Sequence, residues 1–311
     1  MKKTISMVVP TYNEKENIVD GYERLTRIMS ELLPTYNYEI LYIDNFSSDG
    51  TRDLLRILAE KDKNVKVILN GNNYGWSRSS FYGILNTTGD CAVLLAADMQ
   101  EPPEKILDFV KEWENGYKVI IGVKSQSKES KFKYFLRNCY YNFLNQIAEI
   151  NHIKQFMGFG LYDQSFVDVL RKLDDPMPYF RGIVSELGFK VKKLEYVQDA
   201  RKKGKTHFNF FKIYDLAMLG ITSYSKIVMR MATLLGFGLS AVLILIAIIT
   251  FFLKVFNIID YPVGIAAISM GVFALGGIQL FFIGLLGEYI ININTRTMHR
   301  PLVIEEERIN F

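Results

Sequence analysis

The sequence predicts an α/β domain built on a mostly parallel sheet, followed by a pair of membrane-spanning helices. Three observations carry this prediction. Short apolar runs alternate with helix-like stretches through residues 5–123. Polar, acidic loops follow three of those runs, and two long segments near the end of the chain contain no charged residue. Alternation of strands and helices is typical of parallel α/β sheets, and long charge-free segments are typical of membrane spans.

Strands are expected where short apolar runs are bounded by polar turns. They cover residues 5–10, 38–43, 65–70, 91–96 and 118–123. The stretches between them predict helices over residues 14–33, 51–61, 76–86 and 103–115. This order indicates parallel strands joined by helices that cover both faces of the sheet.

Polar loops follow the first, second and fourth expected strands, at residues 11–14 (TYNE), 44–50 (DNFSSDG) and 97–101 (ADMQE). Ligands of parallel sheets bind beyond the carboxyl ends of the strands. These loops suit a nucleotide diphosphate, because one carboxylate can accept a base N–H and another can hold Mg²⁺ or Mn²⁺ on the pyrophosphate. The GxGxxG and P-loop patterns do not occur, so neither a dinucleotide site nor an ATPase site is expected.

Composition excludes other classes of protein. With 49% hydrophobic and 14% aromatic residues, the chain is too apolar to be disordered. Cys91 and Cys139 are far apart and the three histidines are scattered, so a disulfide scaffold or a zinc site is not expected. The N-terminal apolar run is too short for a secretory signal, which favours a cytoplasmic location for the first domain. We expect no nucleic-acid partner.

Residues 231–253 and 261–287 carry no charge, and each is long enough to cross a bilayer core of about 30 Å as a helix. The short connector at residues 254–260 cannot recross the membrane, so the two spans are expected to form a hairpin. Lys226 and Arg230 precede the hairpin, and Arg296 and Arg300 follow it. The positive-inside rule therefore places both termini in the cytoplasm. Two buried core helices are the alternative.

The expected domains are a cytoplasmic domain at residues 1–206, interfacial amphipathic helices at 207–226, and a hairpin with its C-terminal tail at 227–311, with spans at about 229–253 and 261–287. Aromatic and aliphatic residues flanked by lysines favour interfacial helices at 207–226, with ordinary core packing as the alternative. Glycines in the second span allow close helix approach, which favours a homo-oligomer.

Two basic stretches precede the membrane segment. Residues 124–137 hold five cations and one anion, and residues 190–205 hold seven cations and two anions. Both stretches can neutralise the phosphates of a nucleotide or of an anionic lipid. A solvated surface is the alternative for each.

Several short motifs occur in a fixed order: VVPTYNE at 8–14, IDNFSSDGT at 43–51, NYG at 73–75, GD at 89–90 and AADMQEPPE at 96–104. With the expected hairpin they resemble the family 2 glycosyltransferases that act on polyprenyl phosphates, over nearly the whole chain. The second motif is similar to that family's V-D-D-G-S-x-D-G-T nucleotide loop. The last is similar to its D-A-D-L-Q-D-P-P-E metal and donor loop. The resemblance implies a GT-A-like fold that binds a nucleotide sugar.

The resemblance also implies roles for single residues. Pro10, Tyr12 and Glu14 would line the nucleotide pocket. Asp44 would recognise the base, and Ser47 belongs to the same nucleotide loop.

For the reaction itself, the resemblance implies that Asp98 holds the metal and that Gln100 supports the pyrophosphate. Arg201 and Lys205, or Arg137, are the candidates for holding the acceptor. An acidic residue at the start of a helix is the alternative for Asp98.

The chain departs from the family pattern at three places. Ala96 stands where the metal motif has its first aspartate. In the family's G-D-F-R-L segment, Gly158 replaces the proposed base aspartate and Gly160 replaces the arginine. In its R-x-x-G-x-S-K element, His207 replaces the lysine, for which Lys205 can compensate.

The missing base bears on the acceptor. A sugar hydroxyl must lose a proton during attack and gains from a general base. A phosphate monoester has a second pKa of about 6 and is already a dianion at cytoplasmic pH. We therefore expect inverting transfer of a hexose, glucose by resemblance, from a nucleotide diphosphate sugar, with UDP favoured, to undecaprenyl phosphate. Asp163 is either a substitute base or the cap of the next helix.

Two other functions stay open. The first is transfer to a lipid-linked sugar or another glycolipid. The second is a non-catalytic membrane scaffold that binds a nucleotide sugar, which the replacements at Ala96, Gly158 and Gly160 motivate.

Overall fold

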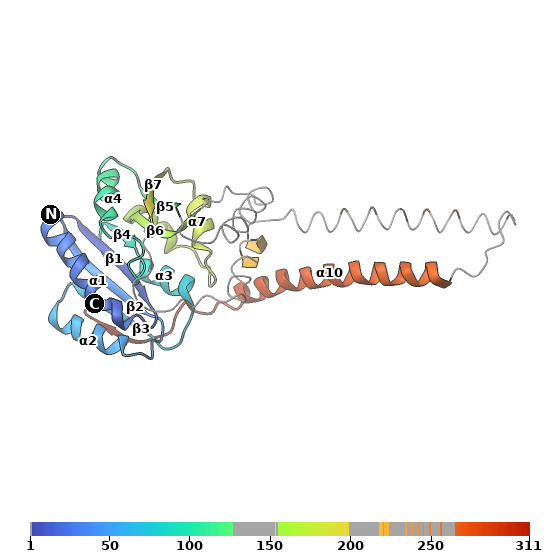
Figure 1. Cartoon of the computed structure of the whole chain (residues 1–311), viewed down its shortest axis with the longest axis horizontal. Helices are drawn as coiled ribbons and strands as arrows, with labels where there is room; N and C mark the ends of the chain where they lie inside the picture. The colour runs from blue at the N-terminus through green and yellow to red at the C-terminus, as the bar shows by residue number, and fades with distance from the viewer. Residues whose placement is uncertain are drawn as a thin grey trace.

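The computed structural model describes residues 2–126, 153, 155–198, 218–219, 221–223 and 265–311, with single positions at 234, 238, 242, 245, 249 and 256. Within these residues, an α/β domain carries one long helix that projects away from it (Figure 1).

One eight-stranded sheet organises the domain, in the order β7-β5-β6-β4-β1-β2-β3-β8. Its strands are β1 Thr4–Thr11, β2 Asn37–Asp44, β3 Val65–Asn70, β4 Cys91–Leu94, β5 Val119–Gln126, β6 Phe156–Asp163, β7 Val191–Val197 and β8 Glu305–Ile309. β1 pairs parallel with β2 and β4, β2 with β3, and β5 with β7. Only β6 and β8 run antiparallel to their neighbours. The prediction of a mostly parallel α/β sheet is confirmed.

The expected strand at 91–96 ends early, at Leu94, because the backbone turns there. The N–H of Ala96 donates to Oε2 of Glu101 at 2.9 Å instead of to a neighbouring strand.

Helices cover both faces of the sheet. The helices of the domain are α1 Lys15–Arg27, continued by the π-helix η1 Ile28–Leu32, α2 Thr51–Lys61, α3 Trp76–Leu85, α4 Lys105–Glu114, α6 Gln164–Leu170 and α7 Phe180–Glu186. Apolar residues of α1, α2 and α4 form one buried cluster with the sheet, and those of α3, α6 and α7 form the main cluster on the other face. The expected helix at 103–115 begins later, at Lys105, after the prolines at 102 and 103.

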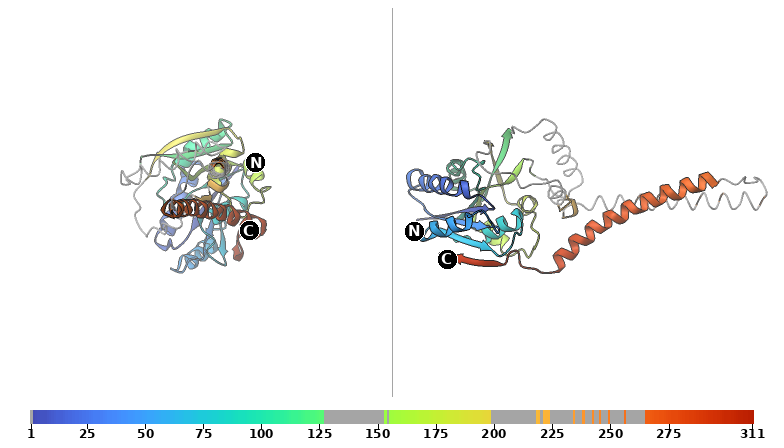
Figure 2. Two further views of the ribbon diagram at one scale, coloured as in Figure 1. Left: turned by 90° about the vertical axis from the view of Figure 1, so that its right-hand side faces the viewer. Right: turned by 60° about the horizontal axis from the view of Figure 1, so that its bottom comes forward.

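The final strand, β8, was not expected from the sequence. It pairs antiparallel with β3, and its first residue, Glu305, lies opposite Asn70, the last residue of β3. The segment before it is fixed by Gly71, whose N–H donates to the carbonyl of Ile304 at 2.9 Å, and by Arg78, which donates to the carbonyls of Pro301 and Leu302. The chain therefore returns from the long helix to the carboxyl edge of the parallel strands (Figure 2).

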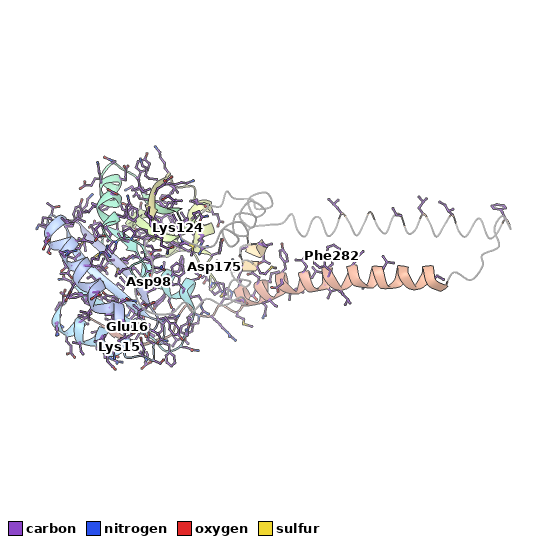
Figure 3. All side chains as sticks on the ribbon, in the orientation of Figure 1. Lys15, Glu16, Asp98, Lys124, Asp175 and Phe282 are labelled. Carbon is purple, nitrogen blue, oxygen red and sulfur yellow. The ribbon has the colours of Figure 1, made fainter. Side chains whose placement is uncertain are left out.

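The long helix α10 runs from Ile265 to Thr297, beyond the expected end of the second span at residue 287. Among the described residues, one segment, Ile278–Thr297, is long and apolar enough to cross a membrane. Arg296, near the C-terminal end of α10, lies 3.3 Å from Asp175 of the domain. Figure 3 shows Asp175 beside the end of α10 that adjoins the domain. Most of the first expected span and of the interfacial segment 207–226 lies outside the described residues, which here are 218–219, 221–223 and the single positions 234, 238, 242, 245 and 249.

Candidate active site

The three polar loops meet at the carboxyl edge of the sheet. Thr11, the last residue of β1, lies opposite Asp44, the last residue of β2. Val8 lies opposite Leu94, the last residue of β4, and its carbonyl accepts from the N–H of Leu95 at 3.1 Å. Because β1 lies between β2 and β4, the loops that follow these strands are neighbours in space, as the sequence predicts.

Asp44 is fully buried at this edge. Its Oδ2 accepts from the N–H of Ser47 at 2.9 Å, and its Oδ1 accepts from the hydroxyls of Ser47 and Thr11. The guanidinium Nε of Arg52 lies 3.5 Å from Oδ2. Burial raises the pKa of Asp44, and these hydrogen bonds and Arg52 offset only part of that effect.

Residues 11–14 are bonded to the loop after β2. The N–H of Asn13 donates to Oγ of Ser47 at 2.8 Å, and its Oδ1 accepts from the N–H of Ser48 at 2.9 Å. The N–H of Glu14 donates to Oγ1 of Thr51 at 3.1 Å. Of the predicted pocket residues here, Pro10 and Glu14 are buried and Tyr12 is half-buried.

Asp98 and Gln100 lie in the loop after β4, and both are half-buried. The N–H of Gln100 donates to Oδ1 of Asp98 at 3.2 Å, and Met99 between them has a φ of +52°. This Asx-like turn fixes the loop locally, although a positive φ is uncommon for a non-glycine residue.

Glu101 places a second carboxylate in the same loop. Its side chain is 9% exposed, and burial together with the charge of Asp98 raises its pKa to about 7. The N–H of Ala96 and the charge of Lys124, near the end of β5, act in the opposite direction. Glu101 thus anchors the loop to the backbone of Ala96, the position where the family pattern has an aspartate.

The charged and amide side chains of this loop, Asp98, Gln100 and Glu101, offer oxygen atoms as metal ligands. Carboxylate and amide oxygens are the ligands that Mg²⁺ and Mn²⁺ prefer. Within the described part of the chain, no group of three or more His, Cys, Asp or Glu side chains forms a preassembled metal site. The carboxylate of Asp98 and the amide oxygen of Gln100 are nevertheless ligand types that fit a hard divalent cation.

The glycines that replace the family's base and arginine have no room for side chains. Gly158 has a φ of +112°, and an added Cβ would lie 2.9 Å from the ring of Trp76. At Gly160 an added Cβ would lie 2.4 Å from the carbonyl oxygen of Ile120. Both replacements are therefore built into the packing of β6.

Asp163 does not substitute for the missing base. It pairs with Cys91 at the start of β4, at the sheet edge opposite to Asp98. Its Oδ1 accepts from the N–H of Ser165 and caps α6, and its Oδ2 accepts from Nε1 of Trp113 at 2.6 Å. The capping interpretation is confirmed.

The described lysines of the two basic stretches lie at different edges of the sheet. Lys124 lies near the carboxyl end of β5, and its charge acts on Glu101. Lys192 lies opposite Ile120 and 3.4 Å from Glu112, near the amino edge. The described lysines at the start of β7 thus lie at the opposite end of the strands from the polar loops, which favours the solvated-surface alternative for this part of the stretch. Arg137, Arg201, Lys205 and His207 lie outside the described residues.

Sequence reasoning missed Arg52 and Phe46. Arg52 lies in the first turn of α2 and contacts Asp44. Phe46 is 45% exposed, has a φ of +68°, and lies with its ring 5.7 Å from the guanidinium carbon of Arg52. A signal was present, because Phe46 occupies the glycine position of the nucleotide-loop pattern.

Comparison with known proteins gives one family. Residues 6–171 match the family described as Glycosyl transferase family 2. The chain is 33% identical over 304 residues to YkcC, an uncharacterized glycosyltransferase of Bacillus subtilis (strain 168), across 97% of this chain and 93% of that protein. It is 31% identical over 311 residues to a bactoprenol glucosyl transferase of Shigella phage SfX, across 98% and 99% of the two chains. Among solved structures, the mannosyl-3-phosphoglycerate synthase of Rubrobacter xylanophilus is similar with a TM-score of 0.48 and 13% identity, over 75% of each chain.

Proposed function

This chain belongs to glycosyl transferase family 2, and from that premise we propose that it transfers a hexose from a nucleotide diphosphate sugar to a polyprenyl phosphate at the cytoplasmic face of a membrane. The observation that carries the proposal is the meeting of three polar loops at the carboxyl edge of the sheet, where the chain also arrives from α10. The near full-length similarity to a bactoprenol glucosyl transferase supports this acceptor and favours glucose.

The loops after β1 and β2 form the proposed nucleotide site. Asp44 recognises the base, and Ser47 holds Asp44 through two hydrogen bonds. Pro10, Tyr12 and Glu14 line the adjacent wall. A buried carboxylate that is already held by several donors loses little conformational entropy when it binds a base N–H.

The loop after β4 forms the proposed donor phosphate site. Asp98 would hold Mg²⁺ or Mn²⁺, which supplies positive charge to the leaving diphosphate. Gln100 supports the pyrophosphate beside it, and Glu101 holds the loop in place through the N–H of Ala96.

A phosphate acceptor suits a site without a general base. One phosphate oxygen forms a bond to C1 of the hexose as the bond from C1 to the diphosphate breaks, and the anomeric centre inverts. No proton has to be removed, because the phosphate is already ionised at cytoplasmic pH. The packing at Gly158 and the position of Asp163 support this assignment. Arg201 and Lys205 are proposed to hold the acceptor phosphate.

The sheet itself supports a membrane hairpin. β1 and β8 belong to one sheet, so the residues that precede and follow the membrane segment lie on the same side of a membrane. A chain that enters the membrane between β7 and β8 then crosses it an even number of times, and we propose residues 229–253 and 261–287 as the two spans. We propose the domain bounds 1–206, 207–226 and 227–311, with both termini cytoplasmic and self-association through the glycines of the second span.

The test is a screen of nucleotide sugars with purified full-length protein, Mg²⁺ or Mn²⁺, and undecaprenyl phosphate, with the lipid product identified by mass. UDP-glucose is expected to give an acid-labile hexosyl phosphate lipid. A product stable to mild acid would indicate transfer to a hydroxyl group instead. Binding of sugar nucleotides without turnover on any polyprenyl phosphate would contradict the proposed function.

A further inference from the structure

The C-terminal strand reaches the proposed nucleotide site through one arginine. Nη2 of Arg52 donates to Oε2 of Glu306 in β8 at 2.8 Å, while Nε of the same guanidinium lies 3.5 Å from Asp44. The Arg52 side chain is 16% exposed, and Glu306 is about half exposed. Arg52 therefore links a strand that follows the membrane helix to the carboxylate proposed to read the base.

A β-bulge directs Glu306 to this position. Leu69 pairs with Glu307 and Asn70 pairs with Glu305, so Glu306 is an extra residue without an opposite partner in β3. Successive residues of a regular strand point to opposite faces of the sheet. Here Glu306 and Glu307 both reach α2, at Arg52 and Arg56, while Glu305 reaches Tyr82 of α3 on the other face. Bulges re-aim side chains in this way next to functional sites.

Arg52 lies close enough for its positive charge to act on Asp44, but too far away for a short hydrogen bond to the carboxylate. A charge-assisted hydrogen bond between nitrogen and a carboxylate oxygen is about 2.7–2.9 Å long, shorter than the 3.5 Å between Nε and Asp44. The bond to Glu306 holds the guanidinium at this distance, so its charge favours ionised Asp44 without a short hydrogen bond to Oδ2. Oδ2 accepts from the N–H of Ser47, whereas both hydroxyl bonds go to Oδ1. The same guanidinium lies over the ring of Phe46, at 5.7 Å from its centre. Phe46 has a left-handed backbone, which is unfavourable for a non-glycine residue, so its contact with Arg52 helps to hold the nucleotide loop in this conformation.

We propose that Glu306 is a positioning residue of the nucleotide site: through Arg52 it sets Asp44 and Phe46 for binding of the nucleoside diphosphate. This inference rests on the proposed function, because it takes Asp44 as the residue that contacts the nucleotide. It assigns to β8 a role in donor binding in addition to closing the sheet.

The chain offers a matched control. Glu307 is the next residue, its carboxylate is exposed to a similar degree, and it pairs with Arg56 on the same helix at 2.8 Å. Arg56 makes its other ion pair with Asp53 and not with Asp44. Glu306→Gln and Glu307→Gln therefore remove equivalent charges and differ in their connection to the proposed site.

The experiment measures UDP-glucose binding to full-length protein in lipid nanodiscs with Mg²⁺ by calorimetry. E306Q is expected to raise the Kd about fivefold and E307Q to leave it within about twofold, since couplings through one network are commonly of this size. E306D is expected to bind UDP-glucose more tightly than E306Q and less tightly than wild type. In turnover assays, E306Q is expected to raise the KM for UDP-glucose and to leave the KM for undecaprenyl phosphate unchanged. Thermal unfolding of the two Gln variants is expected to coincide. Should E306Q fail to fold, E306D and R52K are compared with E307Q instead, and each is expected to bind UDP-glucose more weakly than E307Q does.

The outcomes separate the two levels of the argument. Wild-type protein that binds UDP-glucose while E306Q and E307Q bind it equally well, or equally poorly, overturns the role of Glu306 and leaves the proposed function standing. Wild-type protein that binds no nucleotide sugar overturns the proposed function and this inference together.

Discussion

Both edges of the central sheet carry buried carboxylates, and the two edges hold them differently. At the amino edge, Glu39 accepts hydrogen bonds from Ser6 and Thr88 and pairs with Lys66 at 2.6 Å. Burial raises its pKa, but these partners outweigh burial and lower the pKa overall. At the carboxyl edge, burial prevails, and the pKa values of Asp44 and Glu101 are raised.

This difference separates acids whose charge the fold compensates from acids whose charge it compensates only in part. Glu39 and Asp44 each accept three hydrogen bonds, so the difference lies in the cation: Lys66 is 2.6 Å from Glu39, whereas Arg52 is 3.5 Å from Asp44. A buried carboxylate that is incompletely compensated gains most from a base N–H or a cation. The carboxylate of the amino edge is therefore compensated within the domain, and the carboxyl edge is where we propose that a ligand binds.

The largest expected effect is at Asp98. Asp98→Ala should reduce transfer to undecaprenyl phosphate about 10³-fold, because removal of one electrostatic contact to developing charge typically costs that much. Lipid product formation per mole of folded protein measures it. Asp90→Ala is the control, since Asp90 lies at the amino edge and its Oδ2 accepts from the N–H of Thr4 at 2.7 Å. Turnover within about twofold is expected there. Equal losses in both variants would contradict the division between the edges.

An intermediate effect is expected at Glu39, on stability rather than on turnover. Glu39→Gln should lower the free energy of unfolding at pH 7 by about 3 kcal/mol, because it removes a buried charge that Lys66 and Thr88 require. The folded-state pKa lies below the ordinary value of 4.5, so this stabilisation is present above pH 4.5 and is lost as the pH falls through the folded-state pKa. Urea denaturation at several pH values checks both statements. Unchanged stability with lost turnover would place Glu39 among the functional acids.

The expected effect at Glu101 is at most as large, and it has the opposite sign. The folded protein keeps the Glu101 proton up to about pH 7, whereas an ordinary glutamate loses it near 4.5, so stability falls as the pH rises through this window. Glu101→Gln should therefore be more stable than wild type by up to about 3 kcal/mol at pH 8 and by less than about 1 kcal/mol at pH 5. Thermal unfolding at the two pH values measures the difference. A Gln variant that loses stability at pH 8 would show that Glu101 is compensated like Glu39.

The five expected strands and four expected helices all form, because their hydrophobic patterns are local and agree with the fold. The proximity of Asp44, Glu14 and Asp98 was also predictable, since carboxyl ends of neighbouring parallel strands share an edge. The strand β8 was not predictable, because its three glutamates at 305–307 have low β-propensity. They form a strand because β3 has a free side for pairing and because Arg52 and Arg56 form ion pairs with Glu306 and Glu307. Likewise, the partners of Glu39 come from three separate segments of the chain.

β8 also has a consequence for biosynthesis. Without it, β3 would be the outer strand of the sheet, with Val67 and Leu69 along an edge open to pairing with other chains. Because β8 follows α10 in the chain, β8 cannot cover that edge on the ribosome until α10 has been made. The sheet of the domain is thus completed only after the apolar helix α10 has been synthesised.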